Sequence, residues 1–146
     1  MEENETELLL AKLDGSGSDV EWGAVERLRA MAGNLPMLLR RKFQTAKGWK
    51  IRMSCVYHSI RYARTNDDAF HLGLEAILDR AKYVRYRGAM LLAYAQRADA
   101  LPALRAATTA QNDSDGDLSA AIDAIEARNH NYFVDRNHTG KNNAYN

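Results

Sequence analysis

The middle of the chain contains two similar stretches, GWKIRMSCV at residues 48–56 and AKYVRYRGA at residues 81–89, which lie 33 residues apart. Within them, Ile51-Arg52 aligns with Val84-Arg85, and a small residue follows each arginine three positions later. A period of roughly 20 to 50 residues is typical of proteins that stack copies of one supersecondary unit. The offset therefore predicts stacked repeat units in the centre of the chain.

Apolar residues recur at helical spacing along most of the chain, and no segment shows the alternation of a strand. The expected helices cover residues 3–13, 20–32, 35–46, 49–63, 69–79, 83–95, a segment that includes 101–107, and 118–128. Ser18 or Asp19, and later Asp99, are expected to cap the helices that follow them. Gly33-Asn34 tolerates positive φ and is expected to end the helix before it. The sequence therefore predicts an all-α protein.

The clearest of these helices is expected at residues 83–95, where one stripe of residues faces the core. A small residue at Gly88 would let a neighbouring helix approach closely. The stripe consists of Val84, Gly88, Leu91 and Ala95, and in two other helices the expected inward residues are Leu8, Leu9, Leu10 and Leu13, and Phe70, Leu74, Ile77 and Leu78. One helix pair cannot bury such faces alone, so we expect the pairs to stack.

The repeat pattern extends over residues 49–128. ALPAL at 100–104 precedes an Asp-rich turn and AAIDAI at 120–125, and Asp79 precedes Val84-Arg85 in the same way. This order, with small residues after Val-Arg, resembles a HEAT repeat. The resemblance implies a short right-handed α-solenoid of stacked antiparallel helix pairs. Leu118 stands at the arginine position of the third unit, which indicates a terminal capping unit.

The chain is expected to form a single helical-repeat domain over residues 1–146. Residues 1–19 would be an N-terminal helix and a flexible connector. Residues 129–146 form a C-terminal extension rich in Asn and His, with an aromatic cluster at Tyr132-Phe133-Val134. This extension is expected to be a short strand or an ordered segment, with frayed last residues.

Composition excludes several classes of protein. No apolar run approaches the roughly 20 residues of a membrane-spanning helix. The N-terminus, MEENETELLL, is acidic and lacks the basic start of a signal peptide. The single cysteine, Cys55, excludes an internal disulfide framework and a multi-cysteine metal site. We therefore expect a cytoplasmic protein with no membrane partner.

Charge is distributed unevenly although the net charge is only +1. Residues 40–87 carry twelve Lys and Arg against four acids, a net charge of +8. Residues 1–39 have a net charge of −5 and residues 88–146 one of −2. A basic centre between acidic ends can attract an anionic partner, or it can be a solvated face that pairs with its own flanks.

Arg52 and Arg85 occupy the arginine position of the repeat. The resemblance implies a structural role for both, in which they bond to turn carbonyls or to carboxylates such as Asp79 or Asp117. This role would remove them from the candidate binding residues.

Basic and aromatic residues alternate in the same central region. Arg and Tyr are enriched at protein interfaces, and the same basic residues could contact phosphates. The alternative is a solvated face with extended side chains. The candidate partner-binding residues are Tyr57, Arg61, Tyr62, Arg64, Lys82, Tyr83, Tyr86 and Arg87.

The other residues with reactive or metal-binding side chains are expected to have structural roles. His58, His71, His130 and His138 form no ligand pair at helical spacing, so we expect no metal site. The Asp135 to Gly140 and Asp113 to Asp117 segments begin like calcium loops but lack the rest of the ligand set, and turns are expected. Cys55 is expected to be a buried, inert thiol. No catalytic motif is found, and no cofactor is expected.

These observations favour a non-enzymatic protein-interaction module, either an adaptor or, by analogy of class, a bacterial immunity-type protein that neutralises a toxin. The alternative is nucleic-acid binding or DNA repair on a basic concave face, since HEAT-like repeats also occur in DNA glycosylases. A third hypothesis is a lyase-type chaperone for a chromophore, which some HEAT-like proteins are.

Overall fold

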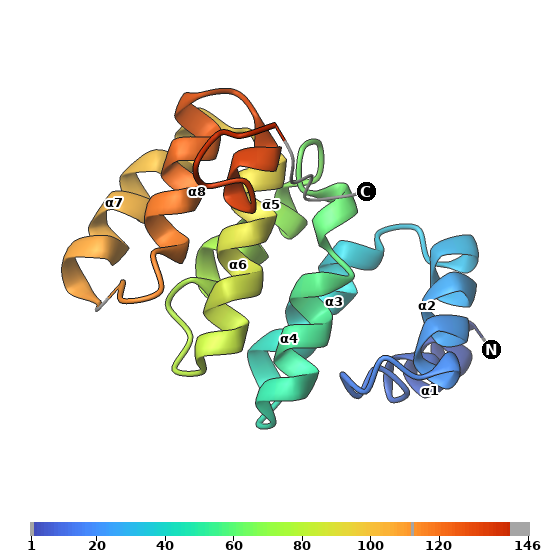
Figure 1. Ribbon diagram of the computed structural model, residues 1–146. Helices are drawn as coiled ribbons and strands as arrows, with labels where there is room; N and C mark the ends of the chain where they lie inside the picture. Colours follow the sequence, from blue (N-terminus) through green and yellow to red (C-terminus); the bar gives the residue numbers. More distant parts are fainter. Residues whose placement is uncertain (1, 112, 141–146) are drawn as a thin grey trace.

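The structure is a computed structural model that describes residues 2–111 and 113–140. Within these residues every regular element is helical, as Figure 1 shows, so the prediction of an all-α protein is confirmed. None of the described helices has the length and hydrophobicity that spanning a bilayer requires. The α-helices are α1 (Glu2–Leu10), α2 (Asp19–Met31), α3 (Leu35–Thr45), α4 (Trp49–Tyr57), α5 (Asp67–Ala76), α6 (Lys82–Ala95), α7 (Leu101–Ala110) and α8 (Asp117–Glu126), and the 3-10 helices are η1 (Ile60–Tyr62), η2 (Ala98–Ala100) and η3 (His130–Phe133).

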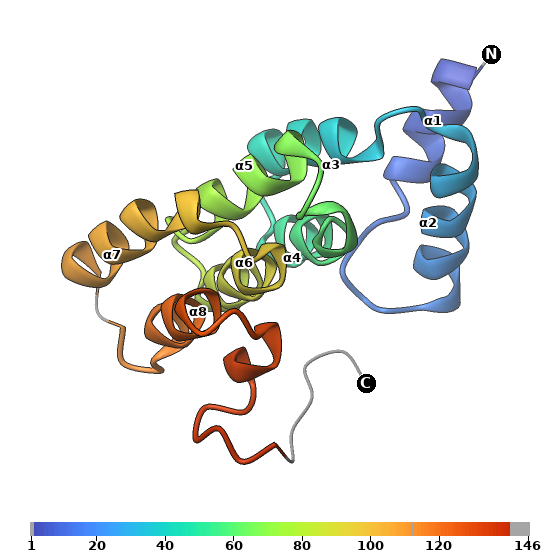
Figure 2. The same ribbon diagram turned by 90° about the horizontal axis from the view of Figure 1, so that it is seen from above.

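Consecutive helices pack against each other along the chain. The contacts join α1 to α2, α3 to α4, α5 to α6 and α7 to α8. They also run sideways, because α6 packs against both α4 and α8, and α3 packs against α5. Figure 2 shows the result as two rows, with α3, α5 and α7 in one row and α4, α6 and α8 in the other, and with α1 and α2 at one end.

Polar side chains define the start of three helices. Ser18, Asn34 and Asn66 each accept a hydrogen bond from the backbone N–H three residues later, at the start of α2, α3 and α5. The cap predicted at Ser18 is therefore confirmed. The cap predicted at Asp99 is wrong, because its carboxylate pairs with Arg97 at 3.0 Å and α7 begins without a side-chain cap.

The end of α2 also differs from the prediction. Ala32 ends the helix in an extended conformation, with φ −85° and ψ 130°, and neither Gly33 nor Asn34 has positive φ. Because the chain leaves the helix in this extended conformation, no left-handed residue is needed, and Asn34 serves the start of α3 instead.

The helix predicted over residues 49–63 is interrupted. α4 ends at Tyr57, and a separate turn of 3-10 helix, η1, follows. The Ser59 hydroxyl donates to the Cys55 carbonyl at 2.8 Å, and the Ser59 N–H bonds to the Val56 carbonyl, only three residues back. This tighter bonding ends the α-helix and directs η1 away from the axis of α4.

Helix α6 packs against α4, α5 and α8, and its predicted inward-facing stripe is buried. Val84, Gly88, Leu91 and Ala95 are all buried. A Cβ placed on Gly88 would lie 2.7 Å from the Cβ of Ala76 in α5, so the predicted close approach is confirmed.

Two leucines predicted to face inward do not do so. Leu8 is 68% exposed and Leu78 is 65% exposed. Leu78 lies beyond the last residue of α5, so helical periodicity no longer sets its direction. α1 packs against α2 on one side only, and Leu9 and Leu10 are on that side while Leu8 is not.

The tail after α8 packs back on the helices as an ordered segment, and no strand occurs in its described part, residues 129–140. Phe133 is 1% exposed and lies 5.5 Å from the ring of Tyr86. Arg136 donates to the carbonyls of Phe133 and Asp115 and forms an ion pair with Asp117 at 2.9 Å. The predicted frayed end falls on residues 141–146, outside the described residues.

Candidate recognition surface

The two repeat arginines make equivalent contacts at the joints between helices. Arg52 Nη1 donates to the carbonyl of Ala46 at 3.2 Å, and Arg85 Nη1 donates to the carbonyl of Asp79 at 2.9 Å. Each carbonyl lies six residues before its arginine, so the offset of 33 residues relates the two bonds. Arg52 also pairs with both carboxylate oxygens of Asp79, at 2.8 and 3.1 Å. The expected structural role is thus observed, with Asp79 and not Asp117 as the partner.

Three of the candidate binding residues, Tyr57, Tyr86 and Arg87, form one cluster across α4 and α6. The Arg87 guanidinium carbon lies 4.9 Å from the ring centre of Tyr57 and 5.3 Å from that of Tyr86. Arg87 Nη1 also contacts the sulfur of Met90 at 3.4 Å. Cation–π contacts of this kind hold the charge and the rings in a defined geometry.

Arg64 lies apart from this cluster, whereas Lys82 lines the same hollow as Tyr86 and Arg87 and also pairs with another part of the chain. Arg64 donates to the Tyr94 carbonyl at 2.9 Å and to His130 Nδ1 at 3.2 Å. Lys82 Nζ lies 4.0 Å from the Asp115 carboxylate, in an exposed pair. Arg64 therefore holds η1 to α6 and to the tail, which ties its charge to the fold.

The remaining tyrosines are also separated. Tyr62 is half-buried and packs on the core, whereas Tyr83 is 54% exposed and stacks on Trp49 with ring centres 5.4 Å apart. Tyr83 and Trp49 lie at the N-terminal ends of α6 and α4. Tyr83 lines the same hollow as Lys82, Tyr86 and Arg87, whereas Tyr62 does not line it.

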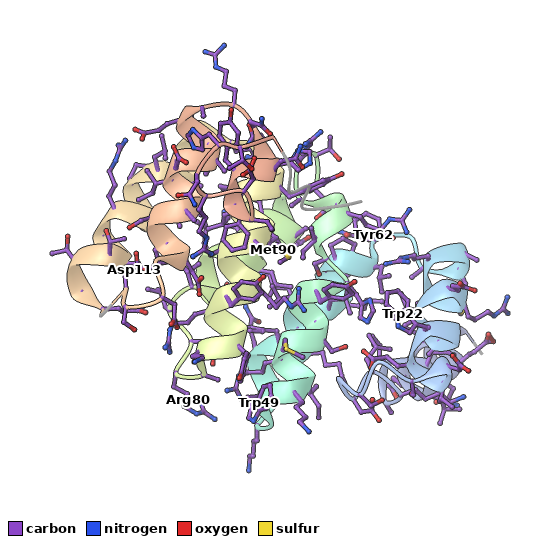
Figure 3. All side chains as sticks on the ribbon, viewed as in Figure 1. Trp22, Trp49, Tyr62, Arg80, Met90 and Asp113 are labelled. Carbon is purple, nitrogen blue, oxygen red and sulfur yellow. The ribbon has the colours of Figure 1, made fainter. Side chains whose placement is uncertain are left out.

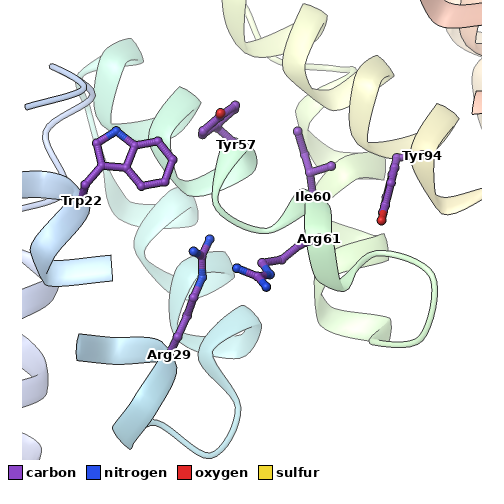
Figure 4. A pocket seen from close by; sticks show the side chains of 6 residues that line it. All are labelled: Trp22, Arg29, Tyr57, Ile60, Arg61 and Tyr94. Atoms are coloured by element: carbon purple, nitrogen blue, oxygen red, sulfur yellow. The ribbon is translucent and has the colours of Figure 1, made fainter. Parts of the chain in front are cut away.

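Arg61 lines a pocket of about 340 Å³. Of the other residues that line this pocket, Tyr57 was also predicted from the sequence to bind a partner, and the rest were not. Figure 4 shows this pocket between α2, η1 and α6. Trp22 of α2 is 37% exposed, and Arg29 lies in the acidic N-terminal region. The lining residues are Trp22, Arg29, Tyr57, Ile60, Arg61 and Tyr94.

Two more hollows adjoin this pocket. The second hollow, of about 230 Å³, shares Trp22 and Tyr57 with the first pocket. The third hollow, of about 350 Å³, shares Met53 and Arg87 with the second hollow. Together they form a basic and aromatic depression along α2, α4 and α6, which we call the inner groove. Its lining residues include Trp22, Arg29, Met53, Tyr57, Arg61, Tyr86, Arg87 and Tyr94, and in the third hollow also Lys82, Tyr83, Asp115 and Asp117.

A buried polar cluster lies beneath the inner groove, where α2 meets α4. Glu21 Oε2 accepts hydrogen bonds from Ser54 Oγ at 2.5 Å and His58 Nε2 at 3.0 Å, and Oε1 accepts from the Gly17 N–H at 3.0 Å. The three side chains are 2–3% exposed. Since Ser54 donates to Glu21 and not to His58, the cluster lacks the nucleophile-to-base bond of a hydrolase triad. It joins the N-terminal helices to the repeat.

Burial and hydrogen bonding set the charges in this cluster. Burial acts to raise the pKa of Glu21, but the hydrogen bonds from Ser54, Gly17 and His58 outweigh it, so the pKa is lowered and the carboxylate is ionised. Burial lowers the pKa of His58, and the nearby charge of Arg29 acts in the same direction. A neutral His58 that donates from Nε2 leaves Nδ1 as an acceptor, and within the described residues Nδ1 has no hydrogen-bond partner.

Cys55 and the two Asp-containing segments, which the sequence analysis also considered as sites, lie in surroundings that fit a structural role. Burial raises the pKa of Cys55 to about 12, as expected for an inert thiol. Asp135 accepts hydrogen bonds from the Thr139 and Gly140 N–H groups, and Asp113 accepts from the Leu118 and Ser119 N–H groups at the start of α8. Both segments contain turns, as predicted. Residues 2–111 and 113–140 contain no group of three or more His, Cys, Asp or Glu that could hold a metal.

Comparison with known proteins gives no match, since no family model, curated protein or solved structure is significantly similar to the chain. Any function must therefore be argued from the surface itself.

Proposed function

We propose that the protein is a non-enzymatic interaction module that binds another protein through the inner groove. The observation that carries this proposal is the set of side chains that the fold brings there: arginines beside Trp and Tyr rings in three adjoining hollows. Trp, Tyr and Arg provide most of the binding energy at protein interfaces, particularly when they line pockets.

Charge complementarity favours an acidic partner. The 340 Å³ pocket is lined by two arginines and by no carboxylate. In the adjoining hollow the lining acid is Glu21, whose carboxylate is buried and already accepts three hydrogen bonds. The 340 Å³ pocket therefore presents positive charge, which would orient and select an acidic surface. The third hollow also contains Asp115 and Asp117, which already pair with Lys82 and Arg136.

We also propose that α3 to α8 are stacked as a short right-handed HEAT-like solenoid. The equivalent bonds of Arg52 and Arg85, and the sideways packing of α4, α6 and α8, support this arrangement. Proteins of this kind use an extended face to bind partners, which suits a cytoplasmic adaptor or an immunity-type protein.

The test is capture of a binding partner from the cells that produce the protein. Wild-type protein should retain one acidic protein, and Arg61→Glu should weaken that binding by at least about tenfold. Arg61 is the best choice because Arg64 and Arg87 also hold the fold together. Arg41→Glu is the matched control, since it makes the same charge change at an exposed position of α3, in the other row of helices. Equal capture by all three proteins would contradict the proposal.

Nucleic-acid binding is the competing outcome. Because it depends on phosphate contacts, duplex binding would weaken steeply with salt and would be independent of the duplex sequence. Binding of this kind by the wild type, lost in Arg61→Glu, would replace the protein-partner proposal.

A further inference from the structure

Arg29 and Arg61 bring two guanidinium groups to one pocket. Arg29 comes from α2 and Arg61 from η1, and Figure 4 shows both groups directed into the same opening. Among the described residues, no carboxylate lies within ion-pair distance of either. Arg40 and Arg97, by contrast, each pair with two carboxylates.

Of Arg29 and Arg61, Arg29 most clearly lacks hydrogen-bond acceptors among the described residues. Its Nε is buried and has no hydrogen-bond acceptor in residues 2–111 and 113–140. A buried donor of a charged group normally finds a partner, because leaving it unbonded costs the free energy of its lost hydration. Within the described residues the chain thus supplies no acceptor for this Nε, while the Arg29 side chain lines the pocket.

Two like charges that share a pocket repel each other, and an anion between them would remove the repulsion. Guanidinium groups bind carboxylate and phosphate oxygens particularly well, because their N–H groups match the geometry of two oxygens. The missing partner therefore has the chemistry of an oxyanion.

The pocket walls and its size limit what carries that oxyanion. Trp22, Tyr57, Ile60 and Tyr94 provide aromatic and aliphatic surface beside the two arginines. A volume of about 340 Å³ is near the lower end of the roughly 300–1,000 Å³ that small-ligand sites have. This space suits a single side chain or a small aromatic acid.

We propose that the pocket between α2, η1 and α6 binds one oxyanion on a short aromatic or aliphatic stem, as an acidic or phosphorylated side chain of a partner protein presents it. Arg29 and Arg61 donate to the oxygens, and the rings of Trp22 and Tyr57 enclose the stem. This proposal deepens the proposed function, on which it rests for the identity of the carrier.

The two tryptophans of the chain supply the test and its internal control. Trp22 lines the pocket, and Trp49 is the first residue of α4, whose last residue is Tyr57. Figure 3 shows Trp22 and Trp49 well apart, yet their exposures are alike at 37% and 38%. The indole N–H signals of the intact protein are followed by NMR during titration with benzoate, phenyl phosphate and neutral benzamide. Benzoate, phenyl phosphate or both should shift the Trp22 signal saturably, while benzamide should not and Trp49 should stay unchanged.

The variant Arg61→Gln should weaken this binding by about tenfold, since it removes one of two charge-assisted contacts. Arg41→Gln should bind as the wild type does. Whichever of benzoate and phenyl phosphate binds more tightly identifies the oxyanion as carboxylate or phosphate. Equal shifts with benzamide, equal shifts at both tryptophans, or unchanged affinity in Arg61→Gln would each overturn the proposal.

The two proposals fail separately. If the small anions do not bind but Arg61→Glu still abolishes partner capture, the oxyanion pocket is wrong and the interaction module stands. If the anions bind but partner capture does not depend on Arg61, the pocket stands and the partner surface is wrong.

Discussion

The joint between α4 and α6 differs from the joint between α2 and α4 in how completely its buried charged side chains are hydrogen-bonded. In the first, Arg52 and Asp79 pair through two hydrogen bonds with side chains only 5% and 7% exposed, and turn carbonyls accept the other N–H groups of Arg52. In the second, Glu21 is fully bonded, but His58 Nδ1 and Arg29 Nε have no partner in the described residues.

We propose that this difference separates a structural joint from one that belongs to a binding site. The α4–α6 joint satisfies its own polar groups, so nothing there calls for a ligand. The α2–α4 joint leaves buried nitrogen atoms unbonded and lies directly beside the inner groove. Departures from full hydrogen bonding are expected at functional sites, where the binding of a ligand offsets their cost.

The largest effect is expected when the α4–α6 joint is broken. Asp79→Asn removes the carboxylate charge opposite a buried Arg52, and the loss of one partner of a buried pair typically costs about 3–5 kcal/mol in the free energy of unfolding. Urea denaturation measures this cost. Glu126→Gln is the control, because its pair with Arg105 is more than half exposed and should contribute less than about 1 kcal/mol. Similar losses in both variants would contradict the distinction between the joints.

An intermediate effect is expected from glycines in α6 and α2. Gly88→Ala places a methyl group 2.7 Å from Ala76 Cβ and 3.0 Å from backbone atoms of α5, so it should destabilise the protein by about 1–3 kcal/mol. Gly23 in α2 has open space around it, and Gly23→Ala should stabilise by about 0.5–1 kcal/mol through helix propensity. Thermal unfolding should therefore shift in opposite directions, and a shift in the same direction would show that α5 and α6 can move apart.

The smallest effect is a pH dependence of the α2–α4 joint. The folded protein lowers the pKa of His58 below its ordinary value of 6.5, so the unfolded chain binds more protons as pH falls. The stability that this group contributes is thus present above about pH 6.5 and is lost as pH falls through the folded pKa.

Denaturation at pH 7.5 and 5.5 measures this dependence. His58→Gln keeps a donor for Glu21 but does not titrate, so its stability should fall less between the two pH values than that of the wild type. Burial also lowers the pKa of His130, which should leave a residual slope in the variant. An identical slope in both proteins would show that His58 does not control the joint.

Local sequence signals predicted a substantial part of this protein. The stripe from Val84 to Ala95 and the cap at Ser18 were predicted correctly, because each depends on residues within one helix or one turn. The close approach at Gly88 was also predicted, because a small residue on the buried stripe is itself a local signal, although its partner Ala76 lies in α5. The 33-residue offset also identified Arg52 and Arg85 as structural, since a repeated unit repeats its internal bonds.

The candidate binding site was predicted only in part. The predicted residues Arg64 and Tyr62 do not line the inner groove, since Arg64 contacts another part of the chain and Tyr62 packs on the core. The predicted residues that line it are Tyr57, Arg61, Lys82, Tyr83, Tyr86 and Arg87. Sequence alone did not identify Trp22, Arg29 and Tyr94, because an exposed position in a helix has no local signature that distinguishes solvent from a pocket.

The sequence by itself determined that the chain is helical, where most helices begin and end, and which arginines repeat. These properties follow from spacing and capping, which act over a few residues. Only the tertiary structure decided that Glu21 meets Ser54 and His58, 33 and 37 residues away, and that Arg29 shares a pocket with Arg61. Those contacts arise where two helices pack together. The geometry of that packing decides which side chains meet, and spacing along one helix does not reveal it.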